Sequence, residues 1–148
     1  TSGNGEGVGF AVPINSAKRL MEQLIADGSV SYAFVGVETE DLTPSLARRF
    51  HYPVARGAVV TSVVKGGPAA KAGMHGGTDS KNVLGIDFVR GGDLVVAIDG
   101  HPVTSSEDIV RIVTSTLLPG QIARFKVRRG QSTLQLPVRL GERSETSP

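Results

Sequence analysis

Glycine, proline and Asp-Gly turns divide the chain from Tyr32 onward into short apolar stretches, and this spacing limits the fold more than any other feature. The expected order is strand, short helix, strand, short helix, strand, long helix, strand and strand. The last two strands, in "ARFKVRRGQSTLQLPVRLG", alternate apolar and polar residues as a hairpin does. About six short strands with two helices predict an α+β fold, a small curled sheet or partial barrel whose open ends the helices cover.

A different pattern precedes Tyr32. Residues 8–12 read as a short apolar strand, and residues 16–27 read as a helix between a candidate N-cap, Asn15, and a candidate C-terminal cap, Gly28. Residues 26–31 are expected to act as a flexible hinge. One apolar face of this helix, which needs a surface to pack on, is formed at helical spacing by Leu20, Met21, Leu24 and Ile25.

Composition narrows the function classes. The chain has 148 residues, of which 39% are hydrophobic and 20% charged, as in an ordinary globular domain. No run approaches the ~20 apolar residues that cross a bilayer, and the first residues lack the basic and apolar blocks of a signal peptide. Because the chain begins without Met, we expect an excised piece rather than a whole cytoplasmic protein.

The charge pattern does not favour nucleic acid as a partner. Net charge is +2, and basic residues, including the pairs Arg48-Arg49 and Arg128-Arg129, are scattered among acidic ones. A nucleic-acid surface would need a basic stripe with interleaved aromatic residues. The absence of cysteine excludes disulfides and thiolate metal sites.

Two stretches resemble a known family. "GGPAAKAGM…GGDLVVAIDGHPVTSSEDI" resembles the PDZ domain of HtrA/Deg serine proteases, and "GVGFAVPINSAKRLMEQL" is similar to the junction before it. The resemblance implies three parts. Residues 1–30 would be the last strand, exit helix and linker of a trypsin-like protease domain. Residues 31–141 would be a PDZ domain, and residues 142–148 a polar, frayed tail.

The stretch "FVGV" occupies the position of the family's carboxylate-binding loop. The resemblance therefore implies that Phe34, Val35, Gly36 and Val37 hold a peptide C-terminus. Backbone N–H groups suit such an anion, and a glycine lets it come close without a Cβ in the way. Phe34 stands where the family often has Tyr, which leaves the backbone chemistry intact. The strand that would pair with the peptide continues through Glu38 and Thr39. The alternative is a bulged strand without a ligand.

The groove's second wall is expected in the helix "SSEDIVRIVTST". One stripe along it, the candidate groove face, contains Ser106, Val110 and Val113. A neighbouring stripe, the candidate core face, contains Ile109, Ile112 and Thr116. A pocket lined by Val35, Val37 and Val113 would accept a terminal Val, Leu, Ile or Phe. The alternative is that both stripes are core.

No catalytic or metal chemistry is expected in this chain. His51, His75 and His101 are widely separated, and none has the spacing of a zinc motif. Nothing resembles the family's Gly-Asn-Ser-Gly-Gly nucleophile segment, and the alternating glycines near the start do not have a nucleotide-loop spacing. We expect no cofactor.

The resemblance implies a peptide-binding module that recruits substrate to, or regulates, an HtrA/Deg-like serine endopeptidase. Its partners would be peptide or unfolded-protein C-termini and its own protease domain. The alternatives are a structural PDZ domain that docks on protease domains within an oligomer, and an unrecognised hydrolase. The family also implies an oligomeric parent, with this chain a monomer or weakly self-associating. It implies an extracytoplasmic location, periplasmic or in the cell envelope with a possible membrane anchor, or an organelle.

Two further expectations concern the flanking segments. Residues 74–92 form a long excursion, interpreted as a hairpin with Gly76-Gly77 and Gly91-Gly92 as hinge-like ends. We expect it to lie away from the groove and to tolerate shortening. The apolar face of the helix at residues 16–27 is expected to pair with a second copy of the chain, since its protease domain is missing.

Overall fold

The computed structural model describes residues 14–27 and 29–146. Residues 32–143 form one compact unit, and the remaining described residues belong to a second, smaller one. The smaller unit contains α1 (Ile14–Asp27), which starts two residues before the expected position, so Asn15 lies inside the helix and is not its cap. Helix boundaries commonly shift by this much. Met21, Leu24 and Ile25 are exposed, and the expected strand at residues 8–12 lies outside the described residues.

A two-stranded ribbon replaces two segments that we expected to be irregular. β1 (Ser29–Phe34) pairs with β10 (Gly141–Thr146). The described part of the expected hinge at residues 26–31 is the end of α1 and the start of β1, so those residues have regular structure. The expected frayed tail is wrong up to Thr146, because backbone pairing between the two chain ends does not require apolar side chains.

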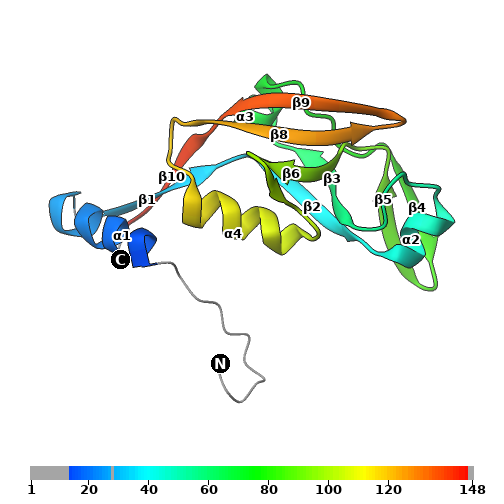
Figure 1. The fold of residues 1–148 in the computed structure, drawn as a ribbon, viewed down its shortest axis with the longest axis horizontal. Helices are drawn as coiled ribbons and strands as arrows, with labels where there is room; N and C mark the ends of the chain where they lie inside the picture. The colour runs from blue at the N-terminus through cyan, green and yellow to red at the C-terminus, as the bar shows by residue number, and fades with distance from the viewer. Residues whose placement is uncertain (1–13, 28, 147–148) are drawn as a thin grey trace, which may run out of the picture. The chain divides into compact units, whose positions relative to one another are not determined.

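The larger unit is built on an open antiparallel sheet (Figure 1). Its strands follow the order β2-β3-β6-β8-β9, with the short β7 beside β6, so β2 and β9 are its edges. The strands are β2 (Val37–Leu42), β3 (Gly57–Val63), β6 (Leu94–Ile98), β7 (His101–Pro102), β8 (Ile122–Arg129) and β9 (Ser132–Arg139). Irregular registers in β2 and β6 bend the sheet. The α+β architecture expected from the turn spacing is confirmed, without closure into a barrel.

The helices of the larger unit begin at local capping or proline signals. α2 (Pro44–Arg49) has Pro44 in its first turn, and the Thr43 hydroxyl accepts from the Leu46 N–H at 3.3 Å. α3 (Pro68–Lys71) is a single turn that also begins with proline. α4 (Ser106–Thr116) is the longest helix of the larger unit, and Ser105 caps it.

Two apolar clusters hold the larger unit together. The main core joins the inward side chains of β8, which alternate as predicted, to α4; its largest fully buried side chains include Phe125, Ile98, Ile112 and Leu140. The second core lies under α2, where Phe50 stacks on Phe88 with ring centroids 5.5 Å apart. Its buried members are Leu42, Ala47, Val59, Phe88 and Leu94.

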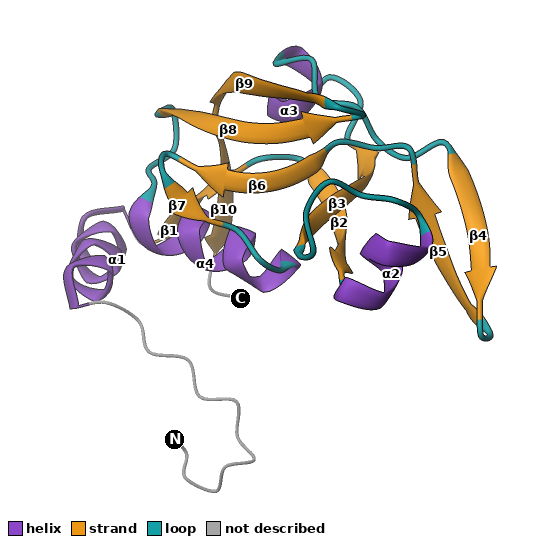
Figure 2. Cartoon of the chain, turned by 45° about the vertical axis from the view of Figure 1, so that its right-hand side comes forward, coloured by secondary structure: helices purple, strands orange, loops and turns teal. Residues whose placement is uncertain are grey.

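The excursion at residues 74–92 contains the expected hairpin, β4 (Asp79–Val83) with β5 (Ile86–Arg90) (Figure 2). It is not remote from β2, however, because the Val89 N–H reaches Glu40 Oε2 at 3.4 Å and Phe88 belongs to the second core. β5 therefore contributes to the packing of the domain, whereas Leu84 at the hairpin tip is 97% exposed. That the hairpin lies away from the peptide groove and tolerates shortening stays a prediction.

The paired glycines beside this hairpin are packing positions rather than hinges. A Cβ on Gly92 would lie 1.9 Å from the Val60 carbonyl oxygen and 2.8 Å from the Gly77 nitrogen. A Cβ on Gly76 would lie 3.0 Å from the Ser62 Cα. Glycine is needed here because two backbone segments touch.

A buried ion pair ties these segments to the sheet. Asp93 is 1% exposed, and its carboxylate accepts from Arg129 Nε at 2.8 Å and Nη2 at 2.7 Å. The same carboxylate accepts from the His75 N–H at 2.9 Å, while Arg129 Nη2 also donates to the Gly73 carbonyl at 2.9 Å. The Asp93 carbonyl accepts from the Val60 N–H at 2.8 Å. One residue therefore joins β3, β6, β8 and the loop after α3.

Replacing Asp93 by Asn should destabilise the protein by roughly 2–3 kcal/mol, because a buried guanidinium contact and a backbone donor both lose their charged acceptor. Urea unfolding followed by circular dichroism measures the change. The matched control is Asp79→Asn, which removes the more exposed ion pair with Arg90 and should have a much smaller effect. Equal losses for the two variants would contradict the role assigned to Asp93.

Candidate functional site

Val35 and Gly36 connect β1 to β2, and the carbonyl groups of these two residues are bound to the domain behind them. The Ala69 N–H of α3 donates to the Val35 carbonyl at 3.0 Å, and the Val64 N–H donates to the Gly36 carbonyl at 2.9 Å. In a trans peptide the N–H points opposite to the C=O. The Gly36 N–H is therefore turned away from Ala69 of α3, and the Val37 N–H is turned away from Val64, which follows β3.

Gly36 has the conformation that the loop was expected to need. Its φ is +81°, in the left-handed region that side chains with a Cβ rarely adopt. A Cβ would meet the Phe34 ring at 3.4 Å and Pro68 Cδ at 3.5 Å. The glycine allows both the turn and its close packing against Phe34 and α3.

The loop leads directly into β2, whose outer edge carries backbone groups that point away from the sheet. Val37 lies opposite Val63, and the Val64 N–H bonds the Gly36 carbonyl, so this is a non-hydrogen-bonded pair. In such a pair, the N–H and C=O of Val37 face away from β3. Among the described strands, β2 has β3 as its one neighbour. Its free side can therefore take an additional strand.

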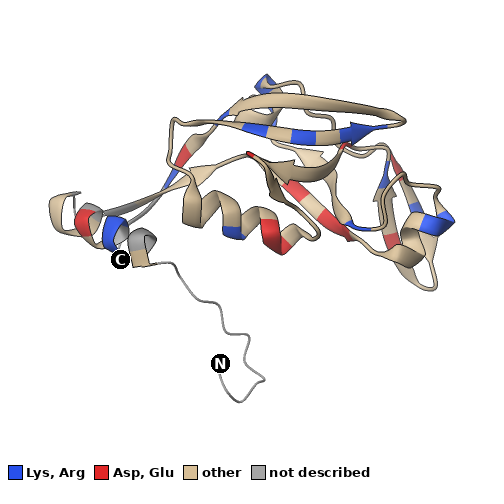
Figure 3. Ribbon diagram, in the orientation of Figure 1, with Lys and Arg blue, Asp and Glu red and all other residues tan. Residues whose placement is uncertain are grey.

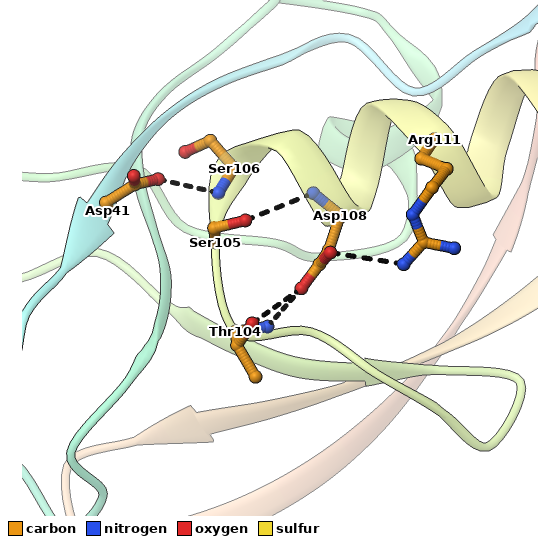
Figure 4. Close-up of polar contacts among 6 residues, drawn as sticks. All are labelled: Asp41, Thr104, Ser105, Ser106, Asp108 and Arg111. Atoms are coloured by element: carbon orange, nitrogen blue, oxygen red, sulfur yellow. Dashed lines mark hydrogen bonds and ion pairs between the residues drawn. The ribbon is translucent and has the colours of Figure 1, made fainter. Parts of the chain in front are cut away.

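Polar side chains connect β2 to the start of α4. The Thr39 hydroxyl donates to Ser106 Oγ at 2.8 Å. The Ser106 N–H donates to Asp41 Oδ1 at 2.7 Å, a contact drawn in Figure 4. We call these two contacts the β2–α4 clamp. The sequence indicated Thr39 and Ser106 as candidate site residues but gave no sign of Asp41 or of the contact between strand and helix. No local pattern could have found it, since Asp41 and Ser106 are 65 positions apart.

The first turn of α4 is itself rigidly held. The Asp108 carboxylate accepts from the Thr104 N–H at 2.8 Å, from the Thr104 hydroxyl at 2.7 Å and from Arg111 Nη2 at 3.1 Å. Partial burial alone would raise the pKa of the Asp108 carboxyl, but the hydrogen bonds from Thr104 and the Arg111 charge outweigh it and lower that pKa. Ser105 completes the cap by accepting from the Asp108 N–H at 3.3 Å.

The apolar site residues lie on both sides of the clamp. Val35 and Val113 are buried in the main core, and Val37 packs against that core while remaining partly exposed. Val110, one turn after Ser106, is 60% exposed. Ile109 and Ile112 are core residues as expected, but Thr116 is exposed and its hydroxyl bonds the Ile112 carbonyl at 2.7 Å. The interpretation of Thr116 as core was wrong, because its side chain is exposed at the last residue of α4.

Acidic residues surround this face. In Figure 3, the ribbon is coloured as Asp or Glu at positions on β2 and at the start of α4, whereas β8 carries positions coloured as Lys or Arg. Glu38 accepts from the Ser62 hydroxyl at 2.8 Å, and Glu40 accepts from the hairpin. Within residues 14–27 and 29–146, no group of three or more His, Asp or Glu residues is arranged to hold a metal ion. The helices in the same part of the chain are too short or too polar to cross a membrane.

Replacing Asp41 by Ala should loosen the start of α4, because the Ser106 N–H loses its acceptor. We expect the exchange of the Ser106 amide to accelerate about threefold to tenfold, as measured by NMR hydrogen exchange. Glu107→Ala, an exposed change in the same helical turn, serves as the control. Unchanged exchange in the Asp41 variant, or an equal effect in both, would contradict the clamp.

Known proteins are similar to this chain in sequence. The profile of a family described as "PDZ domain" matches residues 33–140. A probable periplasmic serine endoprotease DegP-like from Chlamydia trachomatis serovar D is 36% identical over 137 residues, 93% of this chain and 24% of that protein. The periplasmic pH-dependent serine endoprotease DegQ of Escherichia coli K12 is 29% identical over 145 residues, 98% of this chain and 28% of that protein. The chain thus spans about a quarter of these relatives.

Solved structures agree with these matches. The HtrA-type protease AlgW, solved with a decapeptide, has a TM-score of 0.65 and 30% identity, over 93% of this chain and 38% of that one. The HtrA3 PDZ domain, solved with a phage-derived ligand, has a TM-score of 0.57 and 23% identity, over 79% of this chain and 92% of that one. The second similarity supports the fold alone.

Proposed function

Because the chain belongs to the PDZ-domain family, we propose that it binds the C-terminal ends of peptides or unfolded segments whose last residues are apolar. In the parent protein, this module would recruit substrates to, or regulate, an HtrA/Deg-like serine endoprotease. The orientation of the loop at residues 34–37 is the observation that carries the proposal. The Val35 and Gly36 carbonyls are bound to Ala69 and Val64, so the N–H groups of Gly36 and Val37 would be free to receive an incoming carboxylate.

The peptide would bind as an additional strand on β2. Val37 presents its N–H and C=O on the free side of the strand, at the point where the carboxylate loop ends. Main-chain hydrogen bonds would supply affinity without regard to sequence, and Glu38 and Thr39 would continue the pairing. AlgW, a structural neighbour at 30% identity, was solved with a decapeptide, which supports this mode.

Specificity for an apolar end would come from Val35, Val37 and Val113. Two of these valines are buried and the third is partly buried, so the pocket must widen when a ligand enters. The β2–α4 clamp controls that widening, because its two bonds hold the strand and the helix together. Burying one aliphatic side chain contributes about 1.5–3 kcal/mol, which exceeds the net contribution of one ordinary hydrogen bond, about 1 kcal/mol.

The setting of the module follows from its relatives. Those relatives are named serine endoproteases, several of them periplasmic, so we place the parent protein outside the cytoplasm and the catalytic residues in another part of it. The exposed face of α1, with Met21, Leu24 and Ile25, would pack on that protease domain. The alternative of a purely structural PDZ domain predicts no peptide binding at all. The alternative of an unrecognised hydrolase predicts that a bound peptide is cleaved.

A labelled peptide ending in Val with a free carboxylate should bind with an affinity at least about tenfold higher than the same peptide with an amidated end or a terminal Ala. Val110→Asp should abolish binding without unfolding the domain, since Val110 is already exposed. Leu84→Asp, at the exposed hairpin tip, is the matched control and should bind normally. Fluorescence polarisation gives the affinities, and mass spectrometry should find the peptide intact.

The opposite results are equally clear. Equal affinity for the free and amidated ends would show that the peptide carboxylate does not contribute to binding. Normal binding by the Val110 variant would place the ligand elsewhere on the domain. Cleavage of the peptide would support the hydrolase alternative.

A further inference from the structure

A second concave site lies on the larger unit and shares no residue with the groove. It is a cavity of about 390 Å³ between the segment after α2, the base of the β4–β5 hairpin and the β8–β9 turn. Its wall therefore brings together segments that are far apart in the sequence. The charged and aromatic side chains that line it include Phe50, Tyr52, Asp79, Arg90, Arg128 and Arg129.

The three arginines of the cavity are not all neutralised. Arg90 Nε pairs with Asp79 at 3.0 Å, and Arg129 pairs with the buried Asp93. In the part of the chain that the structure describes, Arg128 has no acidic partner, and its Nη1 donates to the Thr133 hydroxyl at 2.9 Å. Three guanidinium charges and two carboxylates leave an excess of one positive charge at the cavity.

Arg128 also has a hydrogen-bond donor that is not used. Its Nε is buried and, among the described residues, has no hydrogen-bond partner. Nε and Nη2 form the side of a guanidinium that binds two oxygens of a carboxylate at once. In its present position, the Arg128 Nε has no hydrogen-bond partner among the described residues. If the guanidinium rotated slightly toward an anion in the cavity, Nε would gain an acceptor without breaking an existing hydrogen bond of its own.

The walls favour a singly charged group on a flexible apolar stem. Asp79 lines the cavity and would repel a doubly charged anion, whereas a single carboxylate matches the excess charge. Phe50 and Tyr52 line the cavity and make part of its wall apolar. Burial raises the pKa of Tyr52, although the Arg90 charge opposes the shift, so its hydroxyl remains neutral and adds no negative charge.

We propose that this cavity binds the carboxylate side chain of a Glu or Asp within an acidic polypeptide segment, with Arg128 as its counter-ion. The site acts independently of the groove beside β2. An extended polypeptide could therefore be held at two points, its apolar end on β2 and an acidic residue at Arg128. Since the cavity requires no free terminus, it also extends recognition to internal segments.

The test uses the full chain labelled with ¹⁵N and the peptide acetyl-Ala-Glu-Ala-amide, whose blocked ends exclude the carboxylate loop. At about 0.15 M salt, where long-range attraction is screened, this peptide should cause saturable amide shifts at Tyr52, Gly91 and Gly130. The matched peptide with Gln in place of Glu should cause little change. Arg128→Gln should weaken binding by about tenfold or more, and Arg128→Lys by less.

The control variant is Arg124→Gln, which removes an exposed arginine of the same strand that does not line the cavity. It should bind the Glu peptide normally, and the spectra of all variants should otherwise coincide. Equal binding of the Glu and Gln peptides, or equal losses in the Arg124 and Arg128 variants, would overturn the proposal. Tighter binding of inorganic phosphate than of the Glu peptide would overturn the assignment to a carboxylate. Displacement of the Glu peptide by an apolar-ended peptide on β2 would overturn the independence of the two sites.

Discussion

The outer edge of β2 is the constraint on which the functional part of the domain depends. An edge strand carries backbone donors and acceptors that water, a side chain or another strand must satisfy. Here β3 occupies one side of β2, and the other side faces α4. Thr39 and Asp41 contact the start of the helix, while Val37 keeps its backbone groups on the free side. Side-chain contacts with α4 therefore cover this edge at Thr39 and Asp41, whereas the backbone groups of Val37 remain available to a peptide backbone.

The rest of the larger unit holds this edge in place. β3 pairs with β2 on one side and with β6 on the other, so any displacement of β3 would move the groove. Asp93, at the start of β6, bonds β3 through its carbonyl and β8 through Arg129. Gly92 beside it lets the chain touch the Val60 carbonyl. A buried charge is an expensive way to join strands, and it is tolerated here because each carboxylate oxygen has hydrogen-bond partners. The second core, built around Phe88, brings the hairpin against this frame.

Local signals predicted most of the backbone elements, because turn residues and alternation indicate the order of strands and helices. Gly36, expected where a ligand comes close without a Cβ in the way, has a φ of +81° that favours glycine, and its role in binding stays a prediction. Contacts between distant segments could not be predicted in this way. The bond between Asp41 and Ser106, and the cavity around Arg128, depend on tertiary packing. The glycines near the hairpin were misread for the same reason, because a glycine in a hinge and a glycine under a crossing strand are identical in sequence. The pairing of β10 with β1 was missed because it involves polar residues.

The most direct measurement is a crystal structure of the chain with a peptide that ends in Val and has a free carboxylate. If the N–H groups of Gly36 and Val37 bind the peptide end, the carboxylate oxygens should lie about 2.7–3.2 Å from the nitrogens of these two residues. The peptide backbone should lie alongside β2, bonded to Val37, with the terminal side chain between Val35 and Val113. A carboxylate bound elsewhere, or a peptide bound without hydrogen bonds to β2, would contradict this mode of binding.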